Sequence, residues 1–232
     1  MTPPSLDTVL SRIGETQAPL PAGVALLLGL VAFIVVLGQT LWKFATHVNT
    51  VVHEAAHALV GLGFGRKVGG VTMAKDGSGA TALAPASGLG FGAAVIVGYI
   101  GPSAAGLVAA KLISIGHIVA ALWLGLLLLA AMLLMVRKFF GGFVILVCGV
   151  LLFLVVRFTA LGAQVAVAYG VTWFLLVSGP KAVLDAGSTP QDAKILARMT
   201  PLWASAWTVL WLIASLAALW IGGAMLIRPA SP

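Results

Sequence analysis

Two histidines lie four residues apart inside a long apolar stretch, in the sequence His53-Glu54-Ala55-Ala56-His57. Residues at this spacing project from the same face of a helix, so both imidazoles can bind one zinc ion. Glu54 lies beside them and can act as general base towards a water that the zinc activates. The alternative is a pair of ordinary helix histidines with a capping glutamate. Because polar groups in so apolar a setting are costly and usually functional, we favour the zinc site.

The composition is that of an integral membrane protein. Of the 232 residues, 61% are hydrophobic and only 8% are charged, whereas a soluble domain carries about 25% charged residues. The net charge of +7 comes from basic residues scattered between apolar runs, which indicates topology signals and no nucleic-acid partner. The single cysteine, Cys148, excludes an intramolecular disulfide and a cysteine zinc cluster.

We predict an all-α polytopic membrane protein with about six to seven transmembrane helices and a small membrane-associated β-hairpin after the HExxH helix. A polar tail at 1–20, with a brief helix at 6–13, precedes one transmembrane domain at 21–228 and a C-terminal tail at 229–232. The first apolar run is about 22 residues long and lacks an A-x-A cleavage site, so we expect it to stay as a membrane anchor. The predicted apolar segments are 21–44, 46–63, 89–112, 115–136, 143–156, 163–177 and 202–227.

Two polar stretches interrupt the apolar segments. The first, at about 66–85, contains Asp76-Gly77, which is a strong turn signal, and we predict a hairpin with strands near 67–74 and 79–84. The second, at about 178–200, is expected to be a polar active-site loop before the last segment.

The basic residues predict which loops face the cytoplasm. Alternate loops place most of them on the side of the N-terminus and of both polar stretches, and this side should be cytoplasmic. With seven segments, the C-terminus is then expected to be external. The cytoplasmic group is Arg12, Arg66, Lys67, Lys75, Arg137, Lys138, Lys181, Lys194 and Arg198, and the other group is Lys43, Lys111, Arg157 and Arg228.

A catalytic zinc ion usually has three protein ligands and one open position, so a third ligand is needed. The predicted topology puts His47 and His117 towards the opposite side, and Asp76 fits better as a turn residue. Asp185 and Asp192 remain, although either can also be an ordinary polar residue of its stretch. The full set of side chains considered, apart from the N-terminal tail, is His47, Asp76, His117, Cys148, Asp185 and Asp192.

Two polar residues share the helix face of His53. Asn49 and Thr50 precede it by four and three positions. They are either partners that orient an imidazole or interfacial polar residues, and the sequence favours neither interpretation.

Together, the HEAAH motif, the hairpin, Gly101-Pro102 in the next segment and a late aspartate resemble the site-2 protease (M50) family. Within it, the sequence is most similar to the compact bacterial M50B-like branch. That branch has a Gly-Arg stretch and a D-G-S-G turn after the motif, and a Ser-Asp-Ala followed by L-A-R-x-T before its last span. The corresponding residues here are Gly65-Arg66, Asp76-Gly77-Ser78-Gly79, Gln191-Asp192-Ala193 and Leu196-Ala197-Arg198-Met199-Thr200.

The resemblance covers about residues 40–225, and HExxH is its specific part. The sequence departs from the wider family in three respects. The GPxxN motif has Ala105 in place of the asparagine, the late L-D-G is only approximated, by 184–187 or by Asp192-Ala193, and no PDZ-like insertion is present. These departures weaken what the resemblance implies about the third ligand and the substrate more than what it implies about the zinc ion.

The resemblance implies an intramembrane zinc metalloprotease that hydrolyses membrane-embedded proteins or peptides. We predict zinc held by His53, His57 and Asp192, with Glu54 as general base. Asp192 is preferred over Asp185 because it follows Pro190 near the start of the last helix, whereas Asp185 precedes Gly187 on flexible backbone. The expected location is the cell membrane, by resemblance a bacterial inner membrane, with the lipid bilayer as a partner.

Other functions are also compatible with the sequence. A catalytically silent membrane scaffold or partner subunit can retain the same zinc site. The sequence is also compatible with an oligomer or with a partner in a membrane complex. A small transporter using His and Asp for protons or metal ions should show internal repeats or paired broken helices, and the sequence shows neither.

Overall fold

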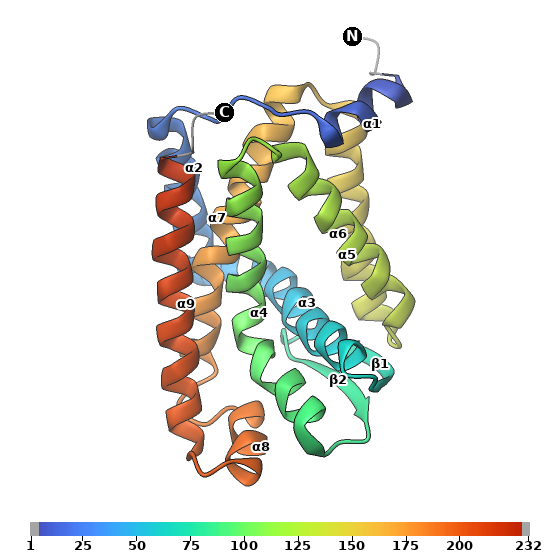
Figure 1. Cartoon of the computed structure of the whole chain (residues 1–232), viewed down its shortest axis with the longest axis vertical. Coiled ribbons are helices and arrows are strands. Elements are labelled where there is room, and N and C mark those ends of the chain that lie inside the picture. The colour runs from blue at the N-terminus through green and yellow to red at the C-terminus, as the bar shows by residue number, and fades with distance from the viewer. Residues whose placement is uncertain (1–4, 229–232) are drawn as a thin grey trace.

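This computed structural model describes residues 5–228, which form nine helices and one β-hairpin (Figure 1). The predicted C-terminal tail at 229–232 and the first four residues of the N-terminal tail lie outside the described residues. The elements are α1 (Leu6–Gly14), α2 (Ala22–Leu37), α3 (Gln39–Gly63), β1 (Lys67–Met73), β2 (Gly79–Ala84), α4 (Gly88–Ser114), α5 (Ile118–Met135), α6 (Phe139–Phe158), α7 (Leu161–Asp185), α8 (Gln191–Met199) and α9 (Ala204–Ile227).

The prediction of a helical polytopic membrane protein with a small hairpin is confirmed. In the described chain, α4, α5, α6, α7 and α9 are each long and apolar enough to cross a membrane. The pair α2 and α3 forms a sixth candidate span, broken by a bend of 99°. The chain therefore has five to six candidate spans, and a seventh is not found among the described residues.

The break in the first span lies at Gly38, which differs from the predicted boundary near 44–46. We expected Lys43 and His47 to mark an interfacial helix end, but both lie within the first turns of α3. At Gly38 a Cβ atom would lie 2.7 Å from the carbonyl oxygen of Ile34, so only glycine fits this turn. A steric requirement at the backbone therefore sets the break, and the polar side chains do not.

Helix α4 is the centre of the bundle and packs against α3, α7 and α9. Small residues allow these close approaches. A Cβ atom at Gly101 would lie 2.6 Å from the Cβ atom of Ala56 on α3, and one at Gly106 would lie 2.9 Å from the side chain of Leu176 on α7. Such contacts are typical of membrane helices, which associate through close packing of small residues.

The hairpin agrees with the predicted strands to within one residue. Its strands pair antiparallel, with Val71 opposite Thr81. The other edge of β1 is occupied, because Val71 also forms a parallel bridge with Val136 and accepts a hydrogen bond from the backbone N–H of Arg137 at 2.8 Å. The α5–α6 turn therefore covers β1, and β2 is the outer strand of the hairpin.

The predicted polar loop at 178–200 is wrong in detail. Most of it is helical, because α7 continues to Asp185 and α8 starts at Gln191. Lys181 and Asp185 form an ion pair at i,i+4 spacing, which stabilises the last turn of α7. We expected Asp185 to lie on flexible backbone, but it is the last residue of α7. Asp192 lies in the first turn of α8, a separate short helix that precedes the final span.

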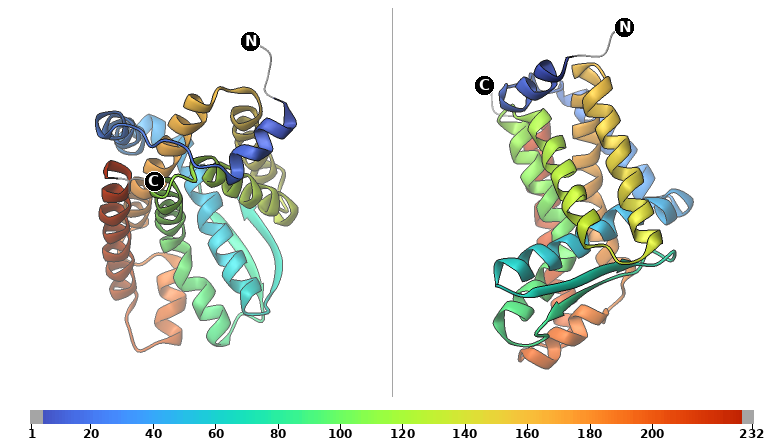
Figure 2. Two further views of the ribbon diagram at one scale, coloured as in Figure 1. Left: turned by 45° about the horizontal axis from the view of Figure 1, so that its top comes forward. Right: turned by 90° about the vertical axis from the view of Figure 1, so that its right-hand side faces the viewer.

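Helix α1 and the C-terminal end of α9 lie at the same end of the bundle, opposite the hairpin and α8 (Figures 1 and 2). Gln17, in the segment after α1, binds the α4–α5 turn and the start of α5. Its backbone N–H donates to the carbonyl oxygen of Gly116, and its Oε1 accepts a hydrogen bond from the backbone N–H of Val119. The expected placement of the two ends on opposite sides is therefore wrong. The cause is that α2 and α3 were counted as two crossings.

Candidate metal centre

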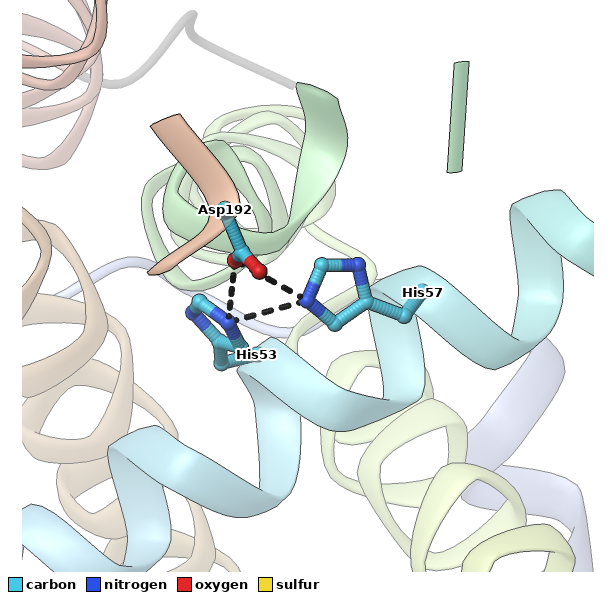
Figure 3. A group of neighbouring side chains, drawn as sticks. All are labelled: His53, His57 and Asp192. Atoms are coloured by element: carbon cyan, nitrogen blue, oxygen red, sulfur yellow. Dashed lines mark hydrogen bonds and ion pairs between the residues drawn. The ribbon is translucent and has the colours of Figure 1, made fainter. Parts of the chain in front are cut away.

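Helix α3 carries both histidines of the motif on one face, as the i,i+4 spacing predicts. The Nε2 atoms of His53 and His57 lie 3.0 Å apart. The helix is continuous from Gln39 to Gly63, so the two rings project from a rigid element. Figure 3 shows both rings directed towards the same point.

Asp192 completes the group from the first turn of α8 (Figure 3). Its Oδ2 atom lies 3.3 Å from the Nε2 atom of His53 and 3.3 Å from that of His57. Zinc–ligand bonds of 2.0–2.1 Å in a tetrahedron place neighbouring ligand atoms about 3.3 Å apart. Two imidazoles and one carboxylate at this separation fit a catalytic zinc ion and leave one coordination position open.

The backbone of α4 orients His57. Its Nδ1 atom lies 2.8 Å from the carbonyl oxygen of Ala94. A carbonyl oxygen can only accept a hydrogen bond, so Nδ1 carries the proton and the Nε2 lone pair faces Asp192 and His53. A second hydrogen bond of this kind fixes the tautomer and the ring orientation of metal-binding histidines.

His53 is held by aromatic packing. The Tyr99 ring meets its imidazole edge-on, with ring centroids 4.6 Å apart. Tyr99 in turn stacks on Trp211 of α9, with ring centroids 4.8 Å apart. The indole N–H of Trp211 donates to the carbonyl oxygen of Ile96 at 2.8 Å. Helices α4 and α9 therefore restrict the His53 ring through these two aromatic side chains.

Gly98 provides the space for both rings. A Cβ atom at this position would lie 2.4 Å from Cε1 of His57 and 2.8 Å from Nε2 of His53. No side chain fits without moving an imidazole. The glycine therefore allows α4 to approach the paired histidines closely.

Apolar packing of α8 places Asp192. Ala193 and Leu196 are fully buried and pack in a cluster with Val95, Val183 and Trp211. Burial by itself raises the pKa of the Asp192 carboxyl, but the neighbouring His53 and His57 imidazoles outweigh burial and lower that pKa. The carboxyl group is therefore ionised, as a metal ligand requires.

Glu54 points to the hairpin and is almost fully buried, with 2% of its surface exposed. The Thr81 hydroxyl of β2 lies 2.6 Å from its Oε2 atom. Thr81 was not among the residues predicted from the sequence, and neither were the roles of Ala94 and Gly98. Only the hairpin prediction pointed towards this part of the site, and it did not say which hairpin residue reaches the helix.

The other candidate ligands lie apart from this group. Asp185 binds Trp42 and Lys181, and Asp76 accepts hydrogen bonds from Ser78 within the hairpin turn. The full set of candidates outside the group is His47, Asp76, His117, Cys148 and Asp185. Among residues 5–228, one group of three such side chains is close enough to share an ion, and it consists of His53, His57 and Asp192.

The two polar residues on the His53 face do not orient an imidazole through any hydrogen bond seen in the described chain. Thr50 donates to the carbonyl oxygen of Gly77 at 2.6 Å and so holds the hairpin turn. Asn49 is buried, and its Oδ1 atom has no hydrogen-bond partner among the described residues. The backbone of Ala94 therefore has the orienting role that we considered for these side chains.

Comparison with known proteins agrees with this arrangement. Residues 26–222 match a family model described as Peptidase M50B-like. No curated protein and no solved structure matches the chain. The matched range contains the HExxH helix, the hairpin, Asp192 and nearly all of the final span. The chain therefore belongs to the Peptidase M50B-like family, within the site-2 protease (M50) family of membrane peptidases.

Proposed function

We propose that the protein is an intramembrane zinc metalloprotease that cleaves membrane-embedded proteins or peptides. The observation that carries the proposal is the convergence of His53, His57 and Asp192 beside Glu54. These three side chains would hold the zinc ion. When bound, zinc supplies Lewis acidity, which makes water a nucleophile near neutral pH and polarises a peptide carbonyl.

The protein's own groups would move the protons. Glu54 takes a proton from the attacking water onto its carboxylate and later gives it to the nitrogen of the leaving amine. Oε2 is bonded to Thr81, so the proton would go to Oε1, which has no hydrogen bond among those seen in residues 5–228. The Ala94 carbonyl keeps His57 in the tautomer that presents Nε2.

The hairpin would hold the substrate in an extended form. A transmembrane helix hides its carbonyls in its own hydrogen bonds, so a substrate span must unwind before cleavage. An unwound segment can pair with an exposed strand edge. Because Val136 and Arg137 cover β1, we propose that the substrate adds to β2.

The same proposal gives the setting of the reaction. Substrate and enzyme share a lipid bilayer, and we propose the cell membrane as the location. Nucleic acid has no part in the reaction. An oligomer or a partner in a membrane complex is compatible with the proposal and is not required by it.

The test uses purified protein in liposomes with a single-span membrane protein as substrate. We expect about one zinc ion per chain, cleavage within or near the substrate span, and loss of cleavage with a zinc chelator. Glu54→Gln should retain zinc and lose cleavage. Wild-type protein that binds zinc but cleaves no member of a panel of single-span substrates would instead support the silent scaffold.

A further inference from the structure

We propose that Thr81 is a positioning residue for Glu54, so that the hairpin forms a wall of the catalytic site as well as a substrate edge. The inference rests on the proposed function. The Thr81 hydroxyl lies 2.6 Å from Glu54 Oε2 and 3.2 Å from the Glu54 carbonyl oxygen. A threonine hydroxyl has one proton, and the shorter contact assigns it to the carboxylate.

The contact belongs to a regular register between β2 and α3. Alternate residues of the hairpin face α3. From Gly77 to Thr81 they meet positions about one helical turn apart, and Leu83 meets Gly61, two turns beyond Glu54. Two strand residues advance about 6.8 Å and four helix residues about 6 Å, so the two periodicities nearly match. The resulting pairs are Gly77 with Thr46 and Thr50, Gly79 with Thr50 and Glu54, Thr81 with Glu54, and Leu83 with Gly61.

Glycines in this register bring the strand close enough for the contact. A Cβ atom at Gly79 would lie 2.4 Å from Glu54 Oε1 and 2.8 Å from Cγ2 of Thr50. Two turns beyond Glu54 on α3, a Cβ atom at Gly61 would lie 2.7 Å from the Leu83 side chain. The hairpin therefore lies against α3 on both sides of Glu54, and Thr81 is held at a fixed height on the helix.

The two oxygens of Glu54 thus have different surroundings. Oε2 accepts the Thr81 hydroxyl, and Oε1 lies against the backbone at Gly79. A buried carboxylate without a hydrogen bond is unfavourable, and it has more freedom to rotate away from the reacting water. Thr81 removes both problems, because its hydroxyl satisfies Oε2 and fixes the plane of the carboxylate.

Substitution of Thr81 separates this role from hairpin packing. Thr81→Val keeps the shape of the side chain and removes the hydroxyl, and Thr81→Ser restores the hydroxyl. Thr72→Val is the matched control, because Thr72 lies in the same hairpin and its hydroxyl contacts only the carbonyl oxygen of Ala80, at 3.4 Å, among the hydrogen bonds seen in the described chain. All variants are assayed as zinc-loaded protein in liposomes with one single-span substrate.

We expect Thr81→Val to lower kcat about tenfold to a hundredfold, which is a part of the roughly 10²–10⁴-fold that a positioned general base contributes, with KM and zinc content unchanged. Thr81→Ser should recover most of kcat, and Thr72→Val should match wild type. Wild-type kcat in Thr81→Val would overturn the proposal. The proposal would also be wrong if Thr72→Val were equally impaired, if Thr81→Ser gave no rescue, or if KM alone changed.

A second measurement does not depend on cleavage. The thermal midpoints of wild type, Thr81→Val, Glu54→Ala and the double variant form a double-mutant cycle, because each single variant removes one partner of the bond. We expect non-additive effects, because the two side chains share one hydrogen bond, and additive effects would overturn the contact. Absence of cleavage by wild type together with non-additive effects would refute the proposed function and the positioning role while retaining the contact.

Discussion

Trp42 donates its indole N–H to the Asp185 carboxylate across 2.7 Å, and this bond ties the first turn of α3 to the last turn of α7. Lys181 strengthens the junction, because its ammonium group pairs with Asp185 and lies 5.3 Å from the centre of the Trp42 ring. The carboxylate of Asp185 is therefore engaged at the bend of the first span. Asp192 faces the histidines instead.

Exchange of the two aspartates for asparagine tests this division. Asp192→Asn should weaken zinc binding at least about tenfold, since it removes an anionic ligand. Asp185→Asn should keep zinc and lower the free energy of unfolding by about 1–3 kcal/mol, as expected for hydrogen bonds to a charged group. Zinc per chain after dialysis against a competing chelator measures the first effect, and thermal unfolding in detergent measures the second. Loss of metal from Asp185→Asn alone would show that the wrong aspartate was chosen.

Glu54→Gln tests the general base. The amide has nearly the same shape as the carboxylate and cannot accept the proton of the attacking water, so kcat should fall about a hundredfold or more. Zinc content should stay at the wild-type value, because Glu54 is not one of the three ligand side chains. A variant that still cleaves a single-span substrate at the normal rate would contradict the mechanism.

Gly98→Ala tests the space that α4 leaves for the imidazoles. The added methyl group would overlap His57 and His53, so we expect zinc affinity to fall roughly tenfold or more, as when the support of a metal ligand is lost. Gly149→Ala is the control, since a Cβ atom at this α6 position has no neighbouring atom within 4 Å among the described residues. Equal zinc affinities for the two variants would show that the histidines tolerate displacement.

The arrangement of the two ends can be tested by labelling. Most basic residues outside the helix interiors lie at the hairpin end, so this end should be cytoplasmic and α1 external. In a Cys148→Ser background, a membrane-impermeant thiol reagent should label Thr16→Cys in intact spheroplasts. Ser78→Cys in the hairpin turn should be labelled only after permeabilisation. Labelling of both positions from outside would contradict this topology.

Local patterns in the sequence were sufficient for much of the fold. Apolar runs predicted the spanning helices, Asp76-Gly77 predicted the hairpin turn, and the i,i+4 spacing predicted that His53 and His57 share one helix face. These features depend on residues within a few positions of one another. Backbone periodicity, turn chemistry and hydrophobicity act at that range, so each can be inferred from a short stretch of sequence.

Packing between distant segments decided the rest. The position of α1 depends on the bonds from Gln17 to residues near 116–119, which no local pattern records. The break at Gly38 and the end of α7 involve residues only four apart, and the distant contribution there is the bond from Trp42 to Asp185. The approach of Asp192 to His53 and the bond between Thr81 and Glu54 join α3 to residues 139 and 27 positions away in sequence. Such contacts arise only when α8 packs against α4 and α9 and the hairpin packs against α3, because close packing over the whole bundle places these elements.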